Sequence, residues 1–174
     1  MGEADSRVVK LNTDGSFCGS TGLVGCGGVV RDDAGRWIIG FCRSIGMTNS
    51  FAAELSGLRE GLLLCSNLNV TSLEIELDAK SIVDALGNPS YINNIISPLL
   101  DDCRLLISRI PQVCIKHYFH QANKCADSLS RMSYCLDSDF ATFDSSLMDL
   151  IDVVKDDLNG MFVNRVCTEN VAVS

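Results

Sequence analysis

The order of the predicted strands and helices is the feature that most constrains the fold of this 174-residue chain. Apolar runs and alternation predict three strands in succession, the last two joined by a turn at Asp33–Gly35. The three strands cover residues 8–14, 25–31 and 36–44, followed by a helix over 50–65, a strand over 73–77, helices over 79–86 and 97–110, a strand over 113–119 and a helix over 123–132. This βββαβααβα order predicts an α/β fold with a five-stranded mixed sheet and helices packed on it.

Helix-start residues refine the predicted boundaries. Ser50 and Asn123 are expected to be N-caps, and Ser97 is expected to cap the helix that has Pro98 at its first position. These caps place Glu54 and Asp127 in the first turns of their helices. In the strand over 73–77, the apolar residues share one face and the acidic residues take the other. The end of this strand therefore delivers Asp78.

Four acidic residues stand in local contexts that suggest one shared site: Asp14, Glu54, Asp78 and Asp127. Taken singly, each has an ordinary explanation, as a turn residue, an N-cap or a complement to a helix dipole. Several carboxylates brought together are tolerated best around bound divalent cations. The four taken together therefore indicate a metal centre, and His117, ten positions before Asp127, is a candidate proton-transfer group.

The motifs around these positions resemble type 1 ribonuclease H, and in particular the RNase H-like domain of plant non-LTR retroelements. They are LNTDGSF (11–17), GCGGVVRDDAGRWIIGF (25–41), AAELSGLREGL (52–62), LEIELDAKSIVDAL (73–86) and HYFHQANKCADSLSR (117–131). The resemblance implies an RNase H-like fold and a two-metal endonuclease that uses Mg²⁺ or Mn²⁺ to hydrolyse the RNA strand of RNA–DNA hybrids. It implies metal ligands at Asp14, Glu54, Asp78 and Asp127, a catalytic histidine at His117, and substrate contacts from Gly15, Ser16 and Asn123.

The charge balance favours a second hypothesis. The net charge is −8, and nucleic-acid affinity comes largely from Lys and Arg. Between Asp78 and Val113 the basic residues are Lys80, Arg104 and Arg109, so the basic protrusion by which bacterial ribonuclease H holds its hybrid has no counterpart. His120 also stands where the plant relatives usually have arginine. The alternative is a retroelement-derived nucleic-acid-binding or scaffold domain that keeps the carboxylates but cleaves weakly or not at all.

The chain is expected to divide into a short tail over 1–7, the RNase H-like domain over 8–135 and an acidic extension over 136–174. Most of the acidic excess lies in this extension, which holds eight acids against two bases. Apolar residues recurring at three and four predict an amphipathic helix over 140–158. This helix is expected either to dock on the core or to bind a protein partner.

Nine cysteines scattered singly, without CxxC pairs, predict buried thiols in a reducing compartment. Cys114, His117, His120 and Cys125 could be mistaken for a zinc site, but Cys114 and His117 would point to opposite faces of one strand. No apolar run approaches the roughly eighteen residues of a membrane span, and the sequence has no signal-peptide pattern. We therefore expect an intracellular protein of the cytoplasm or nucleus that does not bind membranes.

Overall fold

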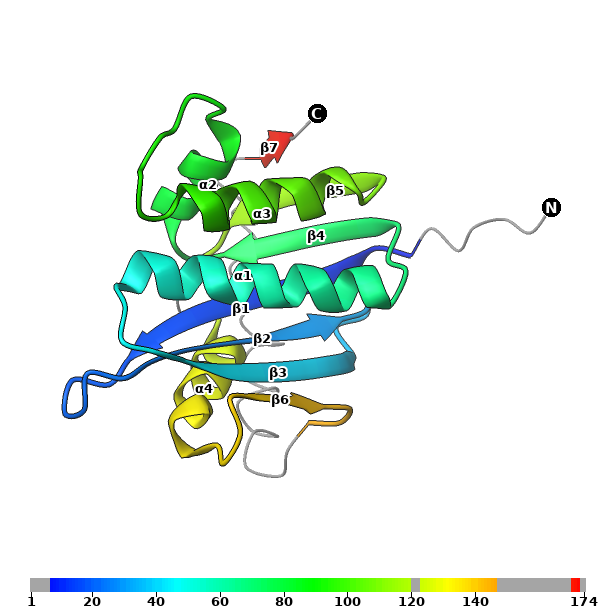
Figure 1. Ribbon diagram of the computed structural model, residues 1–174. Helices are drawn as coiled ribbons and strands as arrows, with labels where there is room; N and C mark the ends of the chain where they lie inside the picture. The colour runs from blue at the N-terminus through cyan, green and yellow to red at the C-terminus, as the bar shows by residue number, and fades with distance from the viewer. Residues whose placement is uncertain (1–6, 120–122, 147–169, 173–174) are drawn as a thin grey trace.

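The computed structural model describes residues 7–119, 123–146 and 170–172, and a mixed β-sheet forms its centre (Figure 1). The elements are β1 (Val9–Phe17), β2 (Val24–Arg31), β3 (Trp37–Gly46), α1 (Ser50–Asn67), β4 (Ser72–Leu77), α2 (Lys80–Gly87), α3 (Ser97–Ser108), β5 (Gln112–His117), α4 (Lys124–Met132), the 3₁₀ turn η2 (Ser133–Cys135), β6 (Phe140–Phe143) and β7 (Asn170–Ala172). Helices α1 and α3 cover one face, and α4 lies on the other. This arrangement confirms the predicted α/β class.

The sheet is built around β1. Its strand order is β6-β3-β2-β1-β4-β5-β7, with β1 antiparallel to β2 and parallel to β4. Strand β5 is parallel to β4, so the carboxyl ends of β1, β4 and β5 lie at one edge of the sheet. Side chains that follow these strands are therefore brought to the same place.

The described sheet has seven strands, so the prediction of five was wrong in number although all five predicted strands are present. The prediction of a helix over 140–158 was wrong for its first residues, because Phe140–Phe143 forms strand β6, which pairs antiparallel with β3. The Phe140 ring lies 6.4 Å from that of Phe41. The sheet thus continues past residue 135, where the domain was expected to end. The part of the predicted helix from residue 147 onward lies outside the described residues.

Two helix caps differ from the prediction. Asn49, not Ser50, caps α1, and its side-chain oxygen accepts a hydrogen bond from the Ala52 amide at 2.8 Å. Helix α1 therefore begins one residue earlier than expected, which moves Glu54 into its second turn. The N-cap of α3 is Ile96, because the Ser97 hydroxyl accepts from the Asn93 amide instead. Asn123 is the N-cap of α4, as predicted, with Asp127 in the first turn.

Two apolar clusters hold the layers together. The larger lies between the sheet and helices α1 and α3, and the smaller lies between the sheet and α4, around Val29, Cys42, Cys125 and Leu129. Helix α4 approaches β2 closely because Gly27 has no side chain: a β-carbon there would meet the Ser130 amide nitrogen and Leu129. Within the described part of the chain, no helix is long and apolar enough to span a membrane.

Candidate metal centre

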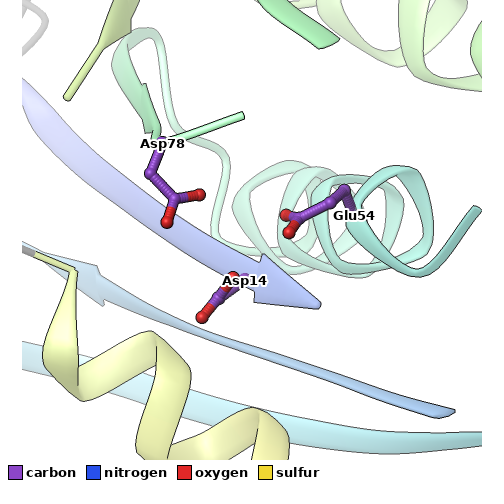
Figure 2. Close-up of side chains that lie close together, drawn as sticks. All are labelled: Asp14, Glu54 and Asp78. Carbon is purple, nitrogen blue, oxygen red and sulfur yellow. The ribbon is translucent and has the colours of Figure 1, made fainter. Parts of the chain in front are cut away.

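Three of the predicted carboxylates meet at the edge of the sheet where β1 and β4 end (Figure 2). Asp14 lies on β1, Asp78 directly follows β4, and Glu54 reaches them from α1. One oxygen from each carboxylate lies within 4.8 Å of the others. The register pairs Asn12 with Glu76, so Asp14 and Asp78 each stand two residues further along adjacent parallel strands. Strand pairing therefore brings these two aspartates together.

A glycine lets the end of β1 touch α1. A β-carbon at Gly15 would lie 2.8 Å from the Ala53 β-carbon and 2.8 Å from the Glu54 amide nitrogen. Real β-carbons essentially never come this close to such atoms, so a side chain at position 15 would push the helix away from the strand. The absence of a side chain at Gly15 thus brings Glu54 within reach of Asp14.

The electrostatics of this cluster favour a cation. Asp14 is only 3% exposed, and Glu54 has a carboxylate oxygen, Oε2, that is buried without a hydrogen-bond partner among the described residues. Burial is the main reason, and the charges of Asp14 and Asp78 the next, that the pKa of Glu54 is raised to about 9. A hydrogen bond from the Gly15 amide acts in the opposite direction and lowers this pKa. Carboxylate oxygens are the ligands that Mg²⁺ and Mn²⁺ prefer. The three side chains therefore fit a divalent cation.

Asp127 lies on the wall of the same cavity but outside the group of three. The cavity has a volume of about 640 Å³ and is lined by Asp14, Gly15, Ser16, Phe17, Cys18, Glu54, Asp78, Asp127, Arg131 and Tyr134. Oδ1 of Asp127 accepts a hydrogen bond from Nε of Arg131, one turn further along α4, at 3.0 Å. The structure thus brings all four predicted metal ligands to one cavity, where the Asp127 carboxylate is paired with the guanidinium of Arg131.

His117 is the last residue of β5 and does not line this cavity. Its Nε2 donates a hydrogen bond to the backbone carbonyl of Asp78 at 3.0 Å, and its ring lies 5.9 Å from that of Phe119. The carbonyl can only accept, so Nε2 carries a proton in this arrangement. His117 is therefore hydrogen-bonded to the backbone of a proposed ligand. His120 lies outside the described residues.

The three residues expected to contact substrate occupy different environments. Gly15 and Ser16 line the cavity, and the Ser16 hydroxyl accepts from the Tyr134 hydroxyl at 2.6 Å. Asn123 is buried, and its Nδ2 donates to the carbonyl of Thr13 at 2.9 Å. This bond ties the start of α4 to β1 immediately before Asp14.

Four residues of the cavity wall were missed by the sequence reasoning: Phe17, Cys18, Arg131 and Tyr134. Arg131 could have been found, because it stands four positions after Asp127 and so shares its helix face. Tyr134 gave no such signal, since it lies in the 3₁₀ turn after α4 and reaches Ser16 only through the tertiary fold.

The fold and the carboxylate group define a domain of the RNase H-like class. Residues 12–133 match the model of the family described as reverse transcriptase-like, and the chain belongs to this family. The predicted resemblance is confirmed.

A curated relative agrees with this assignment. A candidate ribonuclease H protein of Arabidopsis thaliana is 35% identical over 136 residues, which cover 78% of this chain and 22% of that protein. The chain thus spans about a fifth of the length of this curated relative.

Two solved structures share the fold. The N-terminal RNase H domain of a Mycobacterium tuberculosis protein, solved as a maltose-binding protein fusion, has a TM-score of 0.67 at 24% identity, covering 72% of this chain and 91% of that one. LC11-RNase H1 in complex with an RNA/DNA hybrid has a TM-score of 0.64 at 22% identity, covering 71% and 94%.

Proposed function

We propose that this domain is a metal-dependent endonuclease that hydrolyses the RNA strand of RNA–DNA hybrids. The observation that carries the proposal is the meeting of Asp14, Glu54 and Asp78, with oxygens within 4.8 Å, in a cavity that also contains Asp127. A group of like charges so close together is costly unless a cation or a proton neutralises it. The solved hybrid complex of LC11-RNase H1 indicates the substrate class to test.

Asp14, Glu54, Asp78 and Asp127 would hold two Mg²⁺ or Mn²⁺ ions. When bound, such ions supply an activated water and neutralise the charge that develops on the reacting phosphate. The buried, unpartnered Oε2 of Glu54 supports this assignment, because a buried carboxylate oxygen without a partner is otherwise unfavourable.

The other predicted site residues would bind substrate and move a proton. His117 has a proton on Nε2, so Nδ1 of the neutral ring is the basic nitrogen that can accept one. Ser16 presents a hydroxyl on the cavity wall, where it can contact the 2′-hydroxyl that distinguishes RNA from DNA. Asn123 contributes by holding α4, and with it Asp127, against β1.

A cleavage assay on a labelled RNA–DNA hybrid tests this proposal. We expect cleavage of the RNA strand with Mg²⁺ or Mn²⁺, none with chelator, and none of a DNA duplex. Asp78→Asn should be inactive. Asp84→Asn is the matched control, because Asp84 is an exposed acid on α2 that pairs with Lys80 at 3.4 Å away from the cavity. A folded wild-type protein that cleaves nothing, or an Asp78→Asn variant that cleaves normally, would refute the proposal.

The charges of the cavity favour a second candidate function, that of a hybrid-binding domain without cleavage. Its described wall contains four carboxylates and one basic residue, Arg131, whose guanidinium is bound to Asp127. Metal-independent binding of hybrid, with no cleavage in either Mg²⁺ or Mn²⁺, would support this second function over the first.

A further inference from the structure

We propose that Asn12 and Glu76 are positioning residues for the metal centre, and that the hydrogen bond between their side chains sets the spacing of Asp14 and Asp78. The inference rests on the proposed metal binding by these aspartates. Nδ2 of Asn12 donates to Oε2 of Glu76 at 2.6 Å, across two neighbouring strands.

This bond lies where the pairing between β1 and β4 ends. The pairing of β1 with β4 runs from Val9 with Leu73 to Asn12 with Glu76 and ends there. Strand β1 continues to Phe17, but beyond Asn12 it is paired with β2 alone. The Asn12–Glu76 bond therefore lies at the end of the β1–β4 pairing that is nearest to the cavity.

The direction of the side chains connects this tie to the aspartates. Alternate residues of a strand share a face, so Asn12 points to the same face as Asp14. Glu76 has the same relation to Asp78 across the adjacent strand. A change in the distance between Asn12 and Glu76 is thus carried two residues further, to the proposed ligands themselves.

Stability alone does not explain a polar pair at this place. Asn12 is 3% exposed and Glu76 1%, and each retains a buried oxygen, Oδ1 and Oε1, without a hydrogen-bond partner among the described residues. Lys10 Nζ lies 3.8 Å from Oε1 of Glu76, too far for a hydrogen bond. Apolar residues often replace such buried polar groups without loss of stability. A role in geometry accounts for this pair, since a buried hydrogen bond is directional and this one is short, at 2.6 Å.

Metal affinity is the measurement that separates positioning from a purely structural role. Mn²⁺ titrations of the full chain, followed by the electron paramagnetic resonance of free Mn²⁺, should show about tenfold weaker binding for Asn12→Ala and for Glu76→Ala, the lower end of the usual effect of a residue that orients a ligand. The double variant should be no weaker than the weaker single variant, because both changes remove the same bond.

Two further variants provide rescue and control. Glu76→Gln should bind Mn²⁺ like wild type, because the glutamine oxygen still accepts from Asn12. Asp84→Asn is the control, because Asp84 is an exposed acid on α2 that pairs with Lys80 at 3.4 Å. It should also bind normally. If Asn12→Ala does not fold, Asn12→Ser removes the amide donor while keeping a polar group at this position.

Unchanged Mn²⁺ affinity in folded Asn12→Ala and Glu76→Ala would overturn the proposal, as would equal losses in Glu76→Gln and Glu76→Ala. A wild-type chain that binds Mn²⁺ no better than Asp14→Asn would overturn it too. Hybrid cleavage is scored separately: if the affinities follow the expected pattern but wild type does not cleave, the positioning role stands and the nuclease function fails.

Discussion

Binding of a divalent cation should displace a proton from Glu54, and affinity should therefore rise with pH. Without metal, the pKa of Glu54 is raised to about 9 by burial and by the charges of Asp14 and Asp78. At pH 7 this carboxyl is protonated in nearly every molecule, and a cation must replace the proton. Affinity should increase about tenfold per pH unit, hence roughly 100-fold or 2.7 kcal/mol between pH 7 and 9, and level off above that.

Titration calorimetry with Mg²⁺ measures this directly. At pH 7, the apparent binding enthalpy in buffers of different ionisation enthalpy should report release of about one proton. Glu54→Gln should bind Mg²⁺ more weakly and release no proton, whereas Asp84→Asn should behave like wild type. An affinity that stays flat from pH 7 to 9 would refute the reasoning.

The same shift makes a prediction for the metal-free protein. Because the folded-state pKa of Glu54 lies above the ordinary value of 4.5, the unfolded chain loses this proton first as pH rises. The contribution of Glu54 to stability should fall between about pH 4.5 and 9 and then stay constant. Comparison of the pH dependence of unfolding in wild type and Glu54→Gln isolates this contribution.

Four further results are expected. Asp14→Asn should abolish hybrid cleavage yet leave the metal-free fold as stable or more stable, because a charge facing Glu54 is removed; near-normal cleavage would contradict metal ligation. His117→Ala should slow turnover by about 10² to 10⁴, and an unaffected rate would make it a structural histidine. Gly15→Ala should lower the free energy of unfolding by about 1–3 kcal/mol, since its β-carbon meets atoms at 2.8 Å, whereas Gly19→Ala meets nothing within 4 Å and should not. Hybrid affinity should depend weakly on salt, with a log–log slope of magnitude about 2 to 4. A folded chain ending at Ser146, which keeps β6, should bind more tightly at low salt; unchanged binding would show that residues 147–174 are no electrostatic barrier.

The strands and the carboxylate cluster could be predicted because their signals are local. Alternation in 73–77 identified β4, and the residues around Asp14 and Glu54 identified the positions that meet. The cap of α1 could not be settled in this way, since Asn49 and Ser50 are both good capping residues. The choice depends on where the chain turns after β3.

Tertiary contacts decided the features that were missed. The spacing of Phe140 and Phe143 suits a helix, but pairing with β3 and packing on Phe41 make this segment a strand. Glu76 was correctly placed on the acidic face of its strand, yet that face is buried at this point, where Asn12 meets it. No periodicity in the sequence reveals a partner 64 residues away.

The central position of β1 has a consequence for how this protein acquires function. Its partner β2 follows it in the sequence, but β4 and α4 come much later, so a partly folded chain can form the β1–β2–β3 meander without any metal centre. Cation binding would then stabilise only the completely folded domain, and not the partly folded chain, by about 2.7 kcal/mol when the cation concentration is 100 times Kd. Divalent ions should therefore protect the domain cooperatively, suppressing hydrogen exchange in elements as distant from the cavity as the far end of α1.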